Sequence, residues 1–122
     1  MKFQPDTLDG VNVITRLEPG RLWVASTPFT HSVLVPWVGA VLDWAALSFD
    51  DLAPVHFENI AALKPEVVIF GSGPRIRFAS PGLMRSLIDQ RIGVETMDTG
   101  AACRTYNVLV SEGRSVVAAL LL

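Results

Sequence analysis

The sequence of 122 residues contains few of the side chains from which disulfide and metal sites are built. Its one cysteine, Cys103, excludes an internal disulfide and a zinc site with the usual cysteine spacing. Its two histidines, His31 and His56, are 25 positions apart, and neither is followed by a metal ligand three or four residues later. We therefore expect no bound metal ion.

Long hydrophobic runs are also missing, although half of the residues are apolar and the mean hydropathy is +0.40. Apolar runs such as Val116–Leu122 are far shorter than the roughly 20 residues that a membrane-spanning helix needs. The N-terminal residues Met1–Asp6 resemble neither a signal peptide nor an Arg/Ser-rich presequence. We expect a cytoplasmic protein in which residues 1–122 form one domain with a real core.

Charged residues make up only 18% of the chain, and they are distributed unevenly. Residues 1–70 hold four basic and eight acidic side chains, whereas residues 71–122 hold six arginines and four acidic side chains. Because arginine binds carboxylates and phosphates well, we expect any anionic ligand in the second part. The acidic first part and the lack of a basic, aromatic cluster argue against nucleic-acid binding.

Residues 1–47 have the pattern of a β meander. Short apolar strands alternate with turn residues, and a hairpin is predicted around Pro19–Gly20. Pro28 is expected to break the chain after this hairpin. The expected strands are Val11–Leu17, Arg21–Ser26, His31–Val35 and Ala40–Trp44.

Residues 48–122 change to an alternating α/β pattern. A helix is predicted to begin at Ser48 or Asp50, or as late as Ala53, and to end near Leu63. The remainder reads β-α-β-α-β, which predicts parallel strands joined by crossover helices. Its expected elements are a strand at Val67–Phe70, a helix from Ser80–Pro81 to Gly93, a strand at Val94–Met97, a helix from Asp98 or Thr99 to Glu112, and a strand at Val116–Leu121. The fold class is α/β with an N-terminal antiparallel meander.

Two loops follow the carboxyl ends of predicted parallel strands, where ligands tend to bind. The first, Gly71–Arg75, offers glycines, a hydroxyl and an arginine, and the second, Asp98–Gly100, opens a helix whose N–H groups favour an anion. We hypothesise a pocket for a small anion at this rim. Its candidate residues are Gly71, Ser72, Gly73, Arg75, Asp98, Thr99, Arg104 and Asn107.

A structural interpretation of the same residues stays open. The glycines can serve a turn, Asp98 or Thr99 can cap the helix, and Arg104 can brace it. The glycine pattern lacks the third glycine of a dinucleotide fingerprint because Ile76 stands there, and no Gly-Lys-Ser/Thr sequence exists. We therefore predict no nucleotide cofactor and no cofactor of any other kind.

Cys103 and the three tryptophans each allow two interpretations. A thiol in the first turn of a helix beside Arg104 can be activated, but a catalytic cysteine normally needs a histidine base. The helical spacing of Thr99, Cys103 and Tyr106 instead favours a face packed on the sheet. Trp23, Trp37 and Trp44 can form core or an exposed contact surface, and the core is favoured.

Two segments resemble a known family. They are Pro65–Gly73 (PEVVIFGSG) and Ile92–Leu109 (IGVETMDTGAACRTYNVL). They resemble the family of uncharacterised bacterial and archaeal proteins that includes mitochondrial NADH:ubiquinone oxidoreductase complex assembly factor 3. The family commonly has Gly-Thr-Gly where this chain has Gly71-Ser72-Gly73, so the hydroxyl is kept. The resemblance implies a three-layer domain with a central mixed sheet and no established catalytic residues.

Three functions are compatible with these observations. The favoured one is a non-catalytic interaction or assembly factor with a protein partner, and the resemblance implies a role like that of a respiratory complex I assembly factor. The alternative is a protein that binds a small anion or another small molecule with the loops Gly71–Arg75 and Asp98–Asn107. The third is a thiol-dependent enzyme. The partner and the oligomeric state are left open.

Overall fold

The structure, a computed structural model, describes residues 10–122. The expectation about a leader segment falls on residues 1–9 and lies outside this range. Within it, the three strands β1 to β3 form one antiparallel sheet, and five strands form a second sheet in the order β5-β4-β8-β6-β7. The elements are β1 (Ile14–Glu18), β2 (Arg21–Val24), β3 (Thr27–Phe29), β4 (Val33–Pro36), β5 (Leu42–Asp43), the 3₁₀ turn η1 (Phe49–Asp51), α1 (Pro54–Ala61), β6 (Val67–Gly71), α2 (Arg85–Asp89), β7 (Gly93–Met97), α3 (Thr99–Ser111) and β8 (Val116–Leu120).

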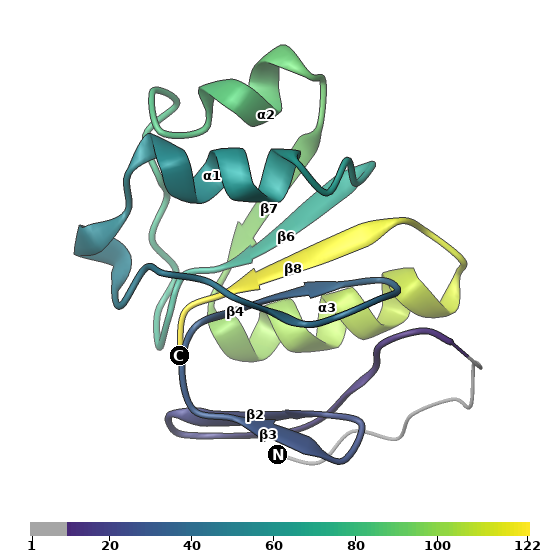
Figure 1. The fold of residues 1–122 in the computed structure, drawn as a ribbon. Coiled ribbons are helices and arrows are strands. Elements are labelled where there is room, and N and C mark those ends of the chain that lie inside the picture. Colours follow the sequence, from purple (N-terminus) through teal and green to yellow (C-terminus); the bar gives the residue numbers. More distant parts are fainter. Residues whose placement is uncertain (1–9) are drawn as a thin grey trace.

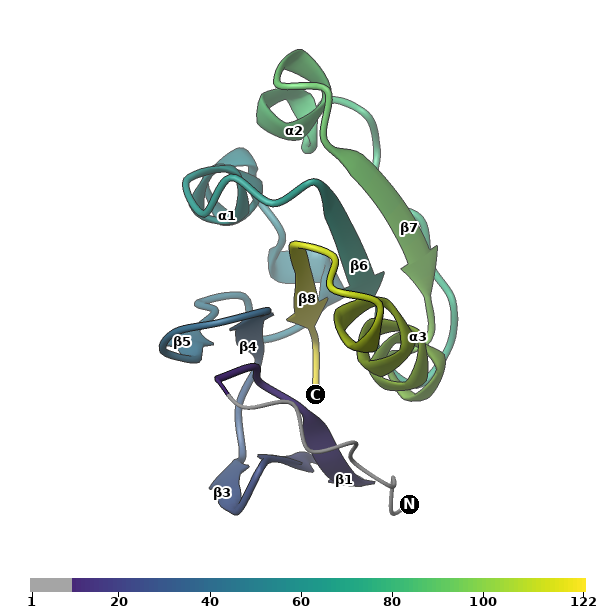
Figure 2. The ribbon, with the colours of Figure 1, turned by 90° about the vertical axis from the view of Figure 1, so that its right-hand side faces the viewer.

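The five-stranded sheet lies in the middle of three layers. Helices α1 and α2 cover one of its faces, and α3 together with the small sheet β1-β2-β3 covers the other (Figures 1 and 2). The predicted parallel β-α-β-α-β unit is confirmed, since β6 pairs in parallel with both β7 and β8. The three-layer fold with a central mixed sheet is likewise confirmed.

Two hydrophobic cores follow from this arrangement, because successive side chains of a strand point to opposite faces of the sheet. In β6, Val67 and Ile69 contribute to the core under α3, whereas Val68 and Phe70 contribute to the core under α1 and α2. Strand β8 divides its side chains in the same way. Strands buried on both faces read as continuous apolar runs, which is why the sequence identified them.

The meander is divided between the two sheets. The hairpin around Pro19–Gly20 is confirmed, with β1 and β2 paired antiparallel and Gly20 at φ +71°. Strands β4 and β5, expected to continue the meander, belong instead to the central sheet, where β4 pairs with β8. Pro28 does not break the chain but lies inside β3 opposite Trp23. Because β3 is an edge strand, the missing N–H of proline breaks no strand pairing.

Helix α1 takes the later of its predicted starts. Ala53 is the N-cap and Pro54 the first helical residue, preceded by the 3₁₀ turn η1. His56 Nδ1 accepts a hydrogen bond from the Ala53 N–H at 2.9 Å, which gives this buried histidine a structural role. Its backbone carbonyl also accepts a hydrogen bond from the Trp44 indole N–H at 2.9 Å.

The helix predicted from Ser80–Pro81 to Gly93 is wrong at both ends, since α2 covers only Arg85–Asp89. Residues 81–84 form turns, because Gly82 follows the proline and glycine disfavours helix propagation. Gly93 does not close the helix but starts β7, and Arg91 takes the left-handed conformation at φ +59°. No helix of the described residues is long and apolar enough to cross a membrane.

The three tryptophans have different environments. Trp44 is 3% exposed and makes T-shaped contacts with Phe57 and Phe70 at centroid distances of 6.0 Å. Trp23 and Trp37 are half-buried. The guanidinium of Arg16 lies 4.9 Å from the centre of the Trp23 ring. Trp44 is therefore core, while Trp23 forms part of the outer surface of the small sheet.

Candidate functional site

The predicted rim exists where β6 and β7 end beside the start of α3. Gly71 closes β6 at a point of tight packing, because a Cβ added there would lie 2.9 Å from Leu120 Cδ2 and 3.1 Å from Ala102 Cβ. The glycine thus permits close approach of α3 to the sheet. The hypothesis from the sequence had instead proposed that the space beside this glycine holds a ligand.

Ser72 uses its hydroxyl within the loop that follows β6. Its Oγ lies 2.8 Å from the Arg75 carbonyl and accepts a hydrogen bond from the Arg77 N–H at 2.9 Å. The residue is only 3% exposed. This hydroxyl shapes the loop from inside.

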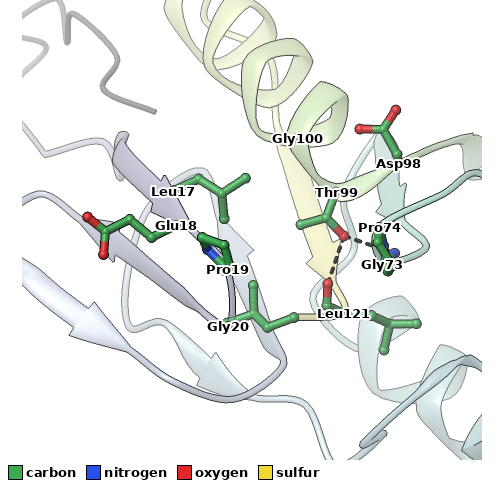
Figure 3. Close-up of a pocket in the computed structure, with 11 residues that line it drawn as sticks. Leu17, Glu18, Pro19, Gly20, Gly73, Pro74, Asp98, Thr99, Gly100 and Leu121 are labelled. Atoms are coloured by element: carbon green, nitrogen blue, oxygen red, sulfur yellow. Dashed lines mark hydrogen bonds between the residues drawn. The ribbon is translucent and has the colours of Figure 1, made fainter.

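Thr99 joins three segments of the rim. Its hydroxyl donates to the Leu121 carbonyl at 2.7 Å and accepts from the Gly73 N–H at 3.0 Å, and its own N–H donates to the Gly73 carbonyl at 2.9 Å (Figure 3). Gly73 has φ +106°, a conformation that favours glycine. The loop after β6, the start of α3 and the residue after β8 are therefore held together by one side chain.

Asp98 is the N-cap of α3, as the structural interpretation predicted. Its Oδ1 accepts a hydrogen bond from the Ala101 N–H at 2.9 Å. N-cap carboxylates satisfy free N–H groups of the first turn and stabilise the helix dipole. The same contact places a negative charge where the hypothesis had expected an anionic ligand.

Asn107 lies away from the rim, and its side-chain amide is hydrogen-bonded to the backbone of β1. Its Oδ1 accepts from the Ile14 N–H at 3.0 Å, and its Nδ2 donates to the Ile14 carbonyl at 2.8 Å. The neighbouring Tyr106 hydroxyl lies 2.8 Å from the Asn12 carbonyl and 3.1 Å from the Pro36 carbonyl. The Asn107 contacts attach the small sheet to α3, and the Tyr106 hydroxyl connects α3 with the segment before β1 and with β4.

The two arginines of the hypothesis are separated. Arg75 is exposed and lines a pocket beside Ser72, whereas the exposed Arg104 lies further along α3 and lines neither pocket of the rim. The structure therefore brings together Gly71, Ser72, Gly73, Asp98 and Thr99 at the rim, with Arg75 beside them. It leaves Arg104 and Asn107 outside.

The larger pocket of the rim has a volume of about 530 Å³ and is mostly apolar. It lies between the β1–β2 turn on one side and the start of α3 with the chain after β8 on the other (Figure 3). Its lining consists of Leu17, Glu18, Pro19, Gly20, Gly73, Pro74, Asp98, Thr99, Gly100, Leu121 and Leu122. Residues 17–20 were not among the site residues predicted from the sequence. Pro19–Gly20 predicts a hairpin turn, but it does not indicate which part of the fold the turn contacts.

A second pocket of about 270 Å³ lies on the other side of Gly73 and Pro74. Arg75 and Arg77 line it together with Phe49, and Arg77 is held in place by Asp50 Oδ1 at 3.2 Å and by the Phe49 ring at 4.1 Å. This pocket carries the positive charge of the rim.

Cys103 is buried in the core under α3 and is not a candidate nucleophile. It is fully buried, and desolvation raises the pKa of its thiol to about 12 despite the nearby charge of Arg104. Both histidines are engaged elsewhere, His31 with Asp43 and His56 with Ala53. Burial thus removes the basis of the thiol-dependent hypothesis, and among residues 10–122 no cluster of three metal-ligating side chains occurs.

Alkylation of Cys103 by iodoacetamide at pH 8 is expected to be extremely slow in the folded protein. A thiol with a pKa of about 12 holds roughly a thousandfold less thiolate than one at the ordinary 9.0, and burial also denies the reagent access. Mass spectrometry over time measures the modification, with the protein in 6 M guanidinium chloride as the control. Labelling of the folded protein at the unfolded rate would contradict the buried position.

The fold defines the chain as an Mth938-like α/β domain. It is similar over 99% of its length to the Bordetella pertussis protein described as an Mth938-like domain, at 31% identity and a TM-score of 0.85, covering 92% of that chain. The chain belongs to the family described as Protein of unknown function (DUF498/DUF598), whose model matches residues 14–121.

Two curated relatives are similar to this chain in sequence. The bovine NADH dehydrogenase [ubiquinone] 1 alpha subcomplex assembly factor 3 is 36% identical over 84 residues, which cover 67% of this chain and 46% of the bovine protein. An uncharacterised protein of Rhodobacter capsulatus is 38% identical over 103 residues, covering 84% of this chain and 78% of that one. The chain spans about half the length of the assembly factor that it matches.

Proposed function

We propose that this protein is a non-catalytic assembly factor that binds another polypeptide and supports formation of a respiratory NADH dehydrogenase, and that it acts in the cytoplasm. The observation that carries the proposal is the 36% identity with assembly factor 3 over two thirds of this chain. The whole assembly factor is longer, so its role is transferred here as a proposal.

The chemistry of the rim supports a binding role. The hydroxyls of Ser72 and Thr99 are engaged with backbone groups, and the Cys103 thiol is buried in the core. These two hydroxyls and this thiol are therefore committed to structure. An apolar pocket and the exposed Arg75 are the groups of the rim that a partner could contact. Such groups are suited to binding another molecule.

Deletion of the gene in its own organism tests the proposal. We expect the amount of assembled NADH dehydrogenase on native gels to fall severalfold, with rotenone- or piericidin-sensitive NADH oxidation of membranes falling in parallel. Wild-type protein supplied in trans restores both, and succinate oxidation serves as the unaffected control. Unchanged assembly would overturn the proposal, and recovery of the tagged protein from the periplasm or an outer-membrane fraction would contradict the cytoplasmic location.

The second pocket favours one alternative function, the binding of a small anion. Arg75 is exposed there beside the Ser72 loop, so a carboxylate or phosphate could pair with it. A thermal-shift series with phosphate, acetate and nucleotides tests this. Binding predicts stabilisation that Arg75→Ala removes and the matched exposed control Arg85→Ala retains. No stabilisation by any of these anions would overturn the alternative.

A further inference from the structure

The two pockets of the rim are neighbours with a common wall. Gly73, Pro74, Leu121 and Leu122 line both of them. We propose that this double pocket binds an extended segment of a partner polypeptide in which a large apolar side chain and an acidic one lie within a few residues of each other. The inference rests on the proposed function and specifies the chemistry of its partner.

The larger pocket selects an apolar group. Its apolar lining side chains include Leu17, Pro19, Leu121 and Leu122. The carboxylates of Glu18 and Asp98 point away from the space between the turn and α3 (Figure 3). The Thr99 hydroxyl already has both a donor and an acceptor partner, so a polar ligand finds little to bind. A volume of about 530 Å³ falls in the usual range for specific binding pockets, about 300–1,000 Å³.

The smaller pocket selects a negative charge. Arg77 is already paired with Asp50 and stacked on Phe49. Arg75 is exposed, and within residues 10–122 no ion pair involves its guanidinium. It is therefore the cation available to an incoming carboxylate. Among residues 10–122, those that line this pocket include no acidic side chain that would compete for Arg75.

The wall between the pockets fixes their relative positions. Thr99 bonds to both Gly73 and Leu121, so the two sides of the wall are tied to the start of α3. An extended chain advances about 3.3 Å per residue, so neighbouring pockets are reached by side chains only a few positions apart. The two preferences thus act on one short segment.

Exposed apolar side chains in the segments that line the smaller pocket favour a polypeptide over a small molecule. Leu47, which lines it, is 81% exposed, and Ile76 and Phe78 of the loop after β6 are 51% and 72% exposed. Exposed apolar side chains grouped beside a pocket are typical of protein contact surfaces. A partner that covers them extends beyond either pocket.

Three fluorescein-labelled dodecapeptides in a Gly/Ser background test the inference by fluorescence anisotropy. One carries Phe and, two positions later, Asp; the second has Lys for the Asp, and the third has Ser for the Phe. The Phe/Asp peptide is expected to bind best, and Arg75→Glu should weaken it about fivefold and turn the preference toward the Phe/Lys peptide. Added salt should reduce the difference.

Two further variants complete the test. Leu122→Gln, in the common wall, is expected to weaken the Phe/Asp and Phe/Lys peptides alike, because it changes polarity without charge. Arg85→Glu on α2 is the matched charge control, since Arg85 is exposed and lines neither pocket. Thermal melts by circular dichroism confirm that all variants are folded. Equal binding of the three peptides, or an Arg75→Glu variant that behaves like wild type, would overturn the inference.

The inference and the proposed function can fail separately. If the deletion strain lacks assembled NADH dehydrogenase but Arg75→Glu and Leu122→Gln restore it fully, assembly does not use this double pocket. If deletion has no effect on assembly, the proposed function fails, and the peptide preferences alone decide the binding chemistry. Full displacement of the Phe/Asp peptide by millimolar acetate or phosphate would instead identify a small-anion site and overturn the inference.

Discussion

Replacement of Asn107 by alanine is expected to lower the free energy of unfolding by about 3 kcal/mol, because each unsatisfied buried polar group costs about 1–3 kcal/mol. The substitution leaves both the N–H and the carbonyl of the fully buried Ile14 without the partner that α3 provides. Chemical denaturation measures the loss. Hydrogen exchange should show that protection falls first in β1 and β2, since the amide attaches this sheet to the rest of the domain.

Two substitutions control this experiment. Asn107→Asp retains an acceptor for the Ile14 N–H but sets a carboxylate oxygen against the Ile14 carbonyl, so a loss at least as large as that of Asn107→Ala is expected at neutral pH. Asn59→Ala removes an exposed asparagine from α1 and should change stability little. An Asn107→Ala variant as stable as Asn59→Ala would contradict the role of the amide.

Replacement of Thr99 by valine, which has nearly the same shape, is expected to cost about 3 kcal/mol for the same physical reason. The Gly73 N–H and the Leu121 carbonyl lose their partner in the wall between the two pockets. For a domain of this size such a loss corresponds to a decrease in Tm of roughly 10 °C. Differential scanning calorimetry measures it.

A further variant distinguishes the contribution of the Thr99 hydroxyl to stability from that of the Thr99 methyl group. Thr99→Ser keeps both hydrogen bonds and should retain most of the stability, whereas Thr105→Val, at a half-buried position further along α3, is the matched change elsewhere. If Thr99→Ser is as unstable as Thr99→Val, packing of the methyl group and not the hydroxyl holds the rim.

The central sheet could be predicted wherever burial on both faces left a clear pattern. Val67–Phe70 and the segment from Val116 form continuous apolar runs, and the capping residue Asp98 marked the start of α3. The pairing partner of β4 could not be predicted, because a short apolar run does not indicate which strand lies beside that run in the sheet. The helix predicted around α2 was too long because Ser80–Pro81 is a typical helix start. In the structure, Gly82 and the turns of residues 81–84 delay the helix until Arg85.

The structure brings part of the residues of the predicted site together at one edge of the central sheet. The rule that loops follow the carboxyl ends of parallel strands located Gly73, Thr99 and Arg75. Asn107 was misplaced because helical spacing gives the direction of a side chain and not its contact, and its partner Ile14 is 93 positions away. The apolar lining from Leu17 to Gly20 came from a different layer, so no local pattern could connect it to the rim.

The order of the strands also sets the order in which the protein can fold during synthesis. Strand β8, the last of the five central strands to be synthesised, lies between β4 and β6 in the central sheet (Figure 2). Until residues 116–120 are available, β4 has no strand through which to join β6 in the central sheet. The nascent chain therefore exposes the edges of the apolar strands β4 and β6 until β8 has been synthesised. Its dependence on chaperones should be greatest at that stage.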